Sequence, residues 1–192
     1  MTKRAIGVLV SGRGSNMAAL IEAAAHPDFP ARIALVISNV ATAGALDIAQ
    51  AAGIPTLAIP HQNFASRADF DREVSRSLHR AKIEIVCLAG FMRLLSPEFT
   101  SEWQGRMLNI HPSLLPKFKG LHTHRRAIEA GETQHGCTVH LVTPDLDDGP
   151  ILGQAHVPVL AGDTPDTLAA RVLEAEHRLY PQVLKDFIRG MA

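Results

Sequence analysis

The sequence has no excess of either charge, because 19 Lys and Arg residues balance 19 Asp and Glu residues. A chain without net charge has no overall field that would hold nucleic acid or an anionic membrane surface. We therefore expect no nucleic acid and no membrane among its partners. Any anionic ligand has to be bound by a local group of residues.

Cysteine is scarce: Cys87 and Cys137 are the two in the chain, and each lies within an apolar stretch. So few cysteines exclude the disulfide framework of a small secreted domain. Two buried free thiols fit a reducing compartment, so we expect a cytoplasmic protein.

Long hydrophobic runs are also missing. No apolar stretch approaches the ~20 residues of a membrane-spanning helix, and the weakly apolar start does not resemble a signal peptide. We expect neither a secretory signal nor a membrane anchor. No repeat or low-complexity linker divides the chain. Its 192 residues, 46% of them hydrophobic, suit a single domain spanning residues 1–192.

The first hundred residues alternate between strand-like and helix-like patterns. The run at residues 83–89 scarcely alternates in polarity, as expected of a central strand covered on both faces. This order predicts an α/β fold with a Rossmann-like N-terminal half and a mostly parallel sheet. The predicted strands are residues 6–10, 33–38, 56–59 and 83–89, and the predicted helices are residues 17–25, 45–52 and 66–80.

The pattern changes in the C-terminal half of the chain. Strand-like segments at residues 107–111, 138–142 and 151–157 are separated by loops too long for tight hairpins, which favours a mixed sheet there. Residues 164–189 have a helical pattern interrupted by Pro181. Because proline removes a helical hydrogen bond and crowds the preceding turn, we expect two helical pieces or a kink at this point.

A glycine-rich loop, Ser-Gly-Arg-Gly-Ser-Asn at residues 11–16, joins the first strand to the first helix. Free N–H groups and the helix dipole at such a helix start attract an anion. The third glycine of a dinucleotide fingerprint is replaced by Met17, and no acidic residue follows the second strand, so NAD is disfavoured. A nucleoside-triphosphate loop would end in Gly-Lys-Ser/Thr. The loop therefore fits a single phosphate monoester, or a turn that merely caps the helix.

A candidate reacting centre lies at residues 108–111, where apolar and polar side chains alternate. On a strand, Asn109 and His111 project to one side while Leu108 and Ile110 face the core. Pro112 ends the regular pairing, which places the two polar side chains at the carboxyl end of the strand. A carboxamide beside an imidazole suits a developing oxyanion. In isolation, such a pair is more often two polar groups satisfied by the backbone at a strand end.

An acidic loop at residues 144–150 can bring a carboxylate against His111, and a carboxylate favours the imidazolium form. Its spacing does not match a calcium loop. Zinc is disfavoured as well, because Cys137 and His140 point to opposite faces of a strand and none of the usual zinc spacings occurs. We expect no metal, and the other histidines are interpreted as core or supporting residues.

Five segments together give the chain a close resemblance to the folate-dependent phosphoribosylglycinamide formyltransferases, over nearly its whole length. They are Ser-Gly-Arg-Gly-Ser-Asn at 11–16, Leu-Ala-Gly-Phe-Met-Arg-Leu-Leu-Ser at 88–96, Asn-Ile-His-Pro-Ser-Leu-Leu-Pro at 109–116, Leu-His-Thr-His at 121–124 and Leu-Asp-Asp-Gly-Pro at 146–150. Arg13 and Asp148 depart from residues frequent in the family, Asn and Gly respectively.

The resemblance implies the transfer of a formyl group from 10-formyltetrahydrofolate to the amine of glycinamide ribonucleotide in purine synthesis. Both partners are small molecules, and the protein would be a monomer or homodimer. Residues 1–100 would form the phosphate-binding half and residues 101–192 the folate-binding and catalytic half. The implied catalytic residues are Asn109, His111 and Asp147; the ribonucleotide would meet Gly14, Ser15, Asn16 and Glu176; the folate would meet Arg67, Met92, Arg93, Leu94, Leu95 and Asn109.

Three other functions use the same residues. A formyltetrahydrofolate hydrolase would use the same triad with water as nucleophile, but it normally carries a further N-terminal domain and has no use for a phosphate loop. A methionyl-tRNA formyltransferase needs an RNA-binding domain and a basic surface, which a neutral chain does not offer. A non-catalytic folate or nucleotide sensor is the alternative from another class, and the intact triad argues against it.

Overall fold

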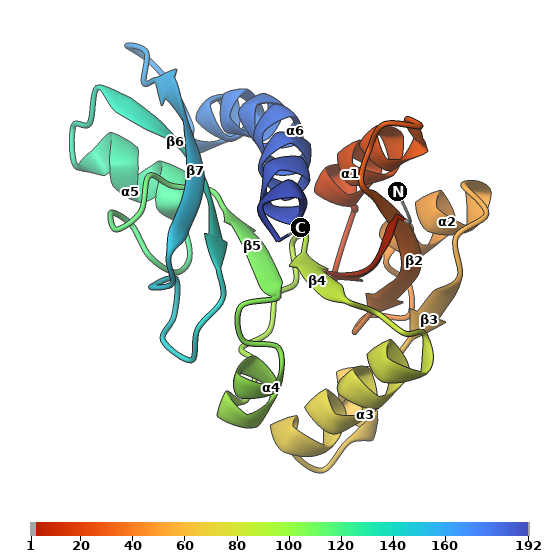
Figure 1. The fold of residues 1–192 in the computed structure, drawn as a ribbon. Coiled ribbons are helices and arrows are strands. Elements are labelled where there is room, and N and C mark those ends of the chain that lie inside the picture. The colour runs from red at the N-terminus through yellow and green to blue at the C-terminus, as the bar shows by residue number, and fades with distance from the viewer. Residues whose placement is uncertain (1–2, 192) are drawn as a thin grey trace.

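The computed structural model describes residues 3–191, which form one seven-stranded sheet in the order β3-β2-β1-β4-β5-β6-β7 (Figure 1). Pairing is parallel from β3 to β5 and antiparallel from β5 to β7. This confirms the predicted α/β fold with a parallel N-terminal part and a mixed C-terminal part. The strands are β1 (Arg4–Val10), β2 (Ala31–Ser38), β3 (Thr56–Ala58), β4 (Ile85–Leu88), β5 (Met107–His111), β6 (Gln134–Leu141) and β7 (Ile151–Pro158).

Helices cover both faces of this sheet, and each face has its own apolar core. On one face, α1, α2 and α6 pack against the sheet, and on the other face α3 and α4 do so (Figure 1). The short helices α4 and α5 lie in segments for which the sequence predicted no helix. The helices are α1 (Ser15–Ala25), α2 (Gly44–Ala51), η1 (His61–Asn63), α3 (Arg67–Arg80), α4 (Pro97–Glu102), α5 (Thr123–Glu129) and α6 (Pro165–Gly190).

The central strand β4 is buried along its whole length, as its unbroken apolar run predicted. Ile85 and Cys87 belong to the core beneath α1 and α6, whereas Val86 and Leu88 belong to the core beneath α3. Cys87 and Cys137 are both free and buried, which confirms that prediction, and burial raises the pKa of each thiol to about 12. No helix among residues 3–191 is long and apolar enough to cross a membrane.

The expected division of the C-terminal tail into two pieces at Pro181 is wrong, because residues 165–190 form the single helix α6 with Pro181 inside it. Thr164 begins the helix with a capping box. Buried side chains on both sides of the proline, among them Leu168 and Leu184, belong to the same core. Continuous packing on one sheet face therefore outweighs the hydrogen bond that the proline removes.

Tyr180 fastens this helix to the centre of the sheet. Its side chain is fully buried, and its hydroxyl lies 3.1 Å from the carbonyl oxygens of both Leu88 and Leu108. Since Leu88 ends β4 and Leu108 lies within β5, one hydroxyl connects α6 to the two strands whose carboxyl ends border the site described below.

Tyr180→Phe removes this hydroxyl while keeping the ring. We expect the free energy of unfolding to fall by about 1–3 kcal/mol, since buried carbonyl groups lose a donor. Urea unfolding followed by circular dichroism measures the change. A difference within about 0.5 kcal/mol, as is usual for surface substitutions, would contradict the structural role assigned to the hydroxyl.

Candidate active site

The candidate site lies where the carboxyl ends of β1, β4 and β5 meet. These three strands are adjacent and parallel, so the loops that follow them leave the same edge of the sheet. The strand order also reverses between β1 and β4, because the chain runs outward to β3 before it returns to β4 (Figure 1). Ligands of open α/β sheets bind at such a switch point.

Asn109 contacts a histidine of the neighbouring antiparallel strand. The register of β5 and β6 pairs Asn109 with His140, and the amide Nδ2 lies 3.2 Å from the imidazole Nε2. His140 Nδ1 donates to the carbonyl of Leu141 at 2.9 Å, so Nε2 is the acceptor in the neutral ring. Burial lowers the pKa of His140, so its ring stays neutral. The acceptor at Nε2 then fixes the orientation of the Asn109 amide.

His111 has an oxygen acceptor facing each of its ring nitrogens. Its Nε2 donates to the carbonyl of Phe118 at 3.0 Å, and its Nδ1 lies 3.4 Å from Oδ2 of Asp147. The His111 and Asp147 side chains are only 7% and 8% exposed. A carbonyl oxygen and a carboxylate oxygen thus face the two nitrogens of one buried imidazole.

Asp147 comes from the loop between β6 and β7, where it adopts a left-handed backbone conformation with φ 49°. Its Oδ2 accepts the N–H of Gly120 at 2.9 Å, and its Oδ1 lies 3.8 Å from Nε2 of His140. The carboxylate therefore stands between two histidines. Successive contacts thus join Asn109 to His140, His140 to Asp147 and Asp147 to His111, and we call these four residues the polar ring.

Three members of the polar ring were predicted from the sequence, and His140 was not given a role beyond that of a core or supporting residue. The signal that locates it is the antiparallel register of β5 and β6, because this register places residue 140 opposite residue 109. Strand alternation within one segment cannot reveal such a partner. Among residues 3–191 there is no group of three or more His, Cys, Asp or Glu side chains that could hold a metal ion.

The glycine-rich loop leads into α1 as predicted. Gly14 is the N-terminal cap with φ 80°, and a Cβ at this position would lie 2.6 Å from Cβ of Ala45. No side chain caps the helix, so its first N–H groups, which begin at Ser15, have no intrahelical partner. These donors face the switch point and suit an anionic group.

Glu176 of α6 reaches the start of α1 despite its distance in sequence. The Asn16 amide donates to Oε2 of Glu176 at 2.7 Å, and both side chains are buried. Burial raises the pKa of Glu176, and the hydrogen bond from Asn16 opposes this effect. The structure thus brings together all four residues predicted to meet the ribonucleotide: Gly14, Ser15, Asn16 and Glu176.

The residues predicted to meet the folate lie on two elements. Arg67 is exposed at the start of α3, and Met92, Arg93, Leu94 and Leu95 lie in the loop between β4 and α4. Met92 and Leu94 are 67% and 55% exposed. The Met92 N–H donates to Oγ of Ser11 at 2.8 Å, so this loop is joined to the glycine-rich loop.

A family model described as formyl transferase matches residues 4–184, nearly the whole chain. This chain belongs to the formyl transferase family. The relatives and neighbours named below also confirm the resemblance found in the sequence.

Three known proteins show how similar this chain is to other members of the family. It is 49% identical over 185 residues to phosphoribosylglycinamide formyltransferase of Escherichia coli (strain K12), covering 96% of this chain and 87% of that protein. It is 50% identical over 183 residues to the trifunctional purine biosynthetic protein adenosine-3 of Homo sapiens, covering 95% of this chain. The crystal structure of phosphoribosylglycinamide formyltransferase from Brucella melitensis superposes with a TM-score of 0.93 at 55% identity, covering 97% and 96% of the two chains.

The trifunctional relatives are much longer than this chain. The chain spans 18% of the Homo sapiens protein and 14% of the Drosophila pseudoobscura pseudoobscura protein. The match therefore covers one portion of each of those proteins.

Glu176→Gln tests how much the buried carboxyl group of Glu176 lowers the free energy of unfolding. Because the native state raises the pKa of Glu176, ionisation of this group costs stability as pH rises through that pKa. We expect the glutamine variant to be more stable than the parent at pH 8. The difference should shrink as pH falls below 4.5, because the carboxyl is then neutral in both the folded and the unfolded state. Urea unfolding at several pH values measures it, and a difference independent of pH would contradict the assignment.

Proposed function

We propose that this chain is a phosphoribosylglycinamide formyltransferase. It transfers a formyl group from 10-formyltetrahydrofolate to the amine of 5-phosphoribosylglycinamide in de novo purine (IMP) biosynthesis, and the products are formyl-GAR and tetrahydrofolate. The observation that carries the proposal is the position of the polar ring beside an uncapped, glycine-rich helix start at the switch point of the sheet. The names of the close relatives support the same reaction.

In the proposed reaction, the primary amine of the ribonucleotide attacks the formyl carbon and the carbonyl oxygen becomes an oxyanion. Asn109 Nδ2 and the His111 imidazolium stabilise this charge. The 3.4 Å distance between His111 Nδ1 and Oδ2 of Asp147 exceeds a normal N–H···O distance, so the Nδ1 donor is not committed to Asp147 and is available to the oxyanion. The other ring nitrogen stays on the Phe118 carbonyl and keeps the ring in place.

Collapse of the tetrahedral intermediate requires a proton transfer. The attacking nitrogen loses a proton, the departing N10 of the folate gains one, and the C–N10 bond breaks as the carbonyl reforms. We assign the relay to a water molecule at the Asp147 carboxylate, whose two oxygens lie toward His111 and His140. Asp147 also keeps His111 charged throughout the cycle.

The ribonucleotide phosphate is proposed to bind the free N–H groups at the start of α1, with Gly14 allowing close approach. Ser15 and Asn16 complete this site, and Glu176 meets the ribose or glycinamide part. This binding mode requires the amine to reach along the carboxyl edge of the sheet toward β5.

The folate is proposed to bind Arg67, Asn109 and the exposed loop of Met92, Arg93, Leu94 and Leu95. It serves as a co-substrate, and the reaction uses no metal. The division into a phosphate-binding half (1–100) and a folate-binding, catalytic half (101–192) stays a prediction, as do a cytoplasmic location and a monomeric or homodimeric state.

The activity itself is tested by incubating the purified protein with 10-formyltetrahydrofolate, with and without glycinamide ribonucleotide. We expect tetrahydrofolate to form only when the ribonucleotide is present. Formation without the ribonucleotide would instead identify a hydrolase, and absence of turnover with retained binding would identify a sensor. Production of formyl-GAR, followed by mass spectrometry, provides a second measurement of the transfer.

His111→Ala removes one of the two groups assigned to the oxyanion. We expect kcat to fall about 100 to 1000-fold, as is typical for loss of one such donor, while the dissociation constants of both substrates change little. Steady-state kinetics and calorimetry measure these quantities. His156→Ala, at an exposed position of β7, is the matched control. Near-parent turnover by a folded His111→Ala protein would refute the assignment.

A further inference from the structure

The segment from residue 118 to residue 122, between β5 and α5, supplies a backbone partner to two members of the polar ring. The carbonyl of Phe118 accepts the Nε2–H of His111 at 3.0 Å, and the N–H of Gly120 donates to Oδ2 of Asp147 at 2.9 Å. We call residues 118–122 the supporting segment. The placement of His111 and Asp147 therefore depends on the backbone of this segment.

The backbone conformation of the supporting segment is unfavourable by itself. Phe118 and His122 adopt left-handed conformations with φ 56° and 58°, and Gly120 between them has φ 76°. A left-handed backbone is rare for residues other than glycine, and it persists where surrounding contacts impose it. The segment thus needs contacts from outside itself to keep its carbonyl and its N–H in place.

Arg126 of α5 contacts the supporting segment at three points. Its Nη1 donates to the carbonyl of Lys119 at 2.6 Å and to the carbonyl of Leu121 at 3.3 Å. Its guanidinium carbon lies 5.4 Å from the ring centre of Phe118, which is a cation–π contact. The two bound carbonyls flank Gly120, so one guanidinium fixes the backbone on both sides of the N–H that reaches the polar ring.

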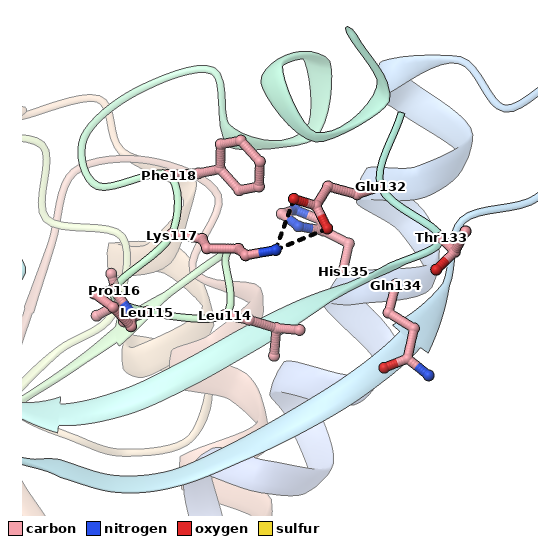
Figure 2. A pocket seen from close by; sticks show the side chains of 9 residues that line it. All are labelled: Leu114, Leu115, Pro116, Lys117, Phe118, Glu132, Thr133, Gln134 and His135. Atoms are coloured by element: carbon pink, nitrogen blue, oxygen red, sulfur yellow. Dashed lines mark hydrogen bonds and ion pairs between the residues drawn. The ribbon is translucent and has the colours of Figure 1, made fainter. Parts of the chain in front are cut away.

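Two ion pairs lie at the same segment. Lys117, which precedes it, has its Nζ 2.8 and 3.0 Å from the two carboxylate oxygens of Glu132 (Figure 2). The side chain of Lys119 pairs with Asp148. Both ion pairs join side chains, whereas Arg126 binds backbone carbonyls directly. Because the backbone sets the positions of a carbonyl and an N–H, we assign the larger effect to Arg126.

We propose that Arg126 is a positioning residue for the formyl transfer step, an inference that rests on the proposed function. By binding the backbone on both sides of Gly120 and the ring of Phe118, it holds the supporting segment in the conformation that orients the two catalytic side chains. Arg126 itself is exposed and is assigned no contact with either substrate. It acts through the supporting segment.

The proposed substrate sites lie on other elements of the fold. The phosphate site is at the start of α1, and the proposed folate contacts lie on α3, on β5 and in the loop between β4 and α4, whereas Arg126 belongs to α5. Loss of a support for His111 and Asp147 should therefore lower kcat and leave the dissociation constants of both substrates unchanged. Loss of a residue that contacts a substrate would instead raise one of these constants.

The test compares Arg126→Ala with Arg125→Ala. Each removes one positive charge from an exposed position of α5 and introduces a strong helix former, so both variants should fold. We expect kcat of Arg126→Ala to fall about 10 to 100-fold, the effect of a small misplacement of catalytic groups. The dissociation constants, measured by calorimetry, should stay at the parent values. Arg125→Ala should match the parent in both quantities.

Hydrogen exchange of the Gly120 amide, measured by NMR on the protein without substrates, gives a second readout. We expect faster exchange in Arg126→Ala, because the N–H is then held less firmly against Asp147. Exchange in Arg125→Ala should equal that of the parent. This readout does not depend on any enzymatic activity.

Parent-like turnover by Arg126→Ala would overturn the inference. An equal loss of turnover in Arg125→Ala would also overturn it, because that result indicates an effect of charge alone. Weaker binding of either substrate by Arg126→Ala, or unchanged exchange of the Gly120 amide, would overturn it as well. Absence of turnover by the parent protein would refute the proposed function, and the exchange of Gly120 would then decide the structural part of the inference by itself.

Discussion

The antiparallel pairing of β6 with β5 is the constraint on which the reacting centre depends. All strands on one side of β5 are parallel, and their carboxyl ends supply loops to a single edge. The reversal at β6 brings His140 opposite Asn109, and the following loop carries Asp147 back over His111. Because β6 is antiparallel, it ends beside the start of β5, and the loop that follows it folds back to bring Asp147 to His111.

Two tertiary links hold the remaining parts of the site against this centre. The Asn16 to Glu176 hydrogen bond joins the first helix to the last, and the Met92 to Ser11 hydrogen bond joins the loops that follow β4 and β1. Neither link is local in sequence. The site is therefore complete only when nearly the whole sheet has formed, and its geometry inherits the rigidity of two packed cores.

Sequence patterns predicted the fold class, the order of the strands along the chain and the position of Asn109 and His111 on one face of a strand, and the family resemblance singled out Asp147 from the acidic loop. The patterns succeeded because alternation within a strand is a local property, and because parallel strands place their following loops at one edge. They did not predict the role of His140. This residue acquires its role from Asn109, a partner on another strand. The predicted break at Pro181 was wrong for a similar reason, because the packing that keeps α6 continuous involves other elements of the fold.

The contact between His111 and the Phe118 carbonyl has a consequence for the entropy of the reaction. The His111 side chain is 7% exposed and its Nε2 is hydrogen-bonded to a backbone carbonyl, so it has little rotamer freedom before any substrate arrives. The entropy cost of ordering the His111 side chain therefore arises once, during folding, and not again in each catalytic cycle. The sheet and the loop from β5 to α5 thus hold the His111 ring in one orientation before the oxyanion forms.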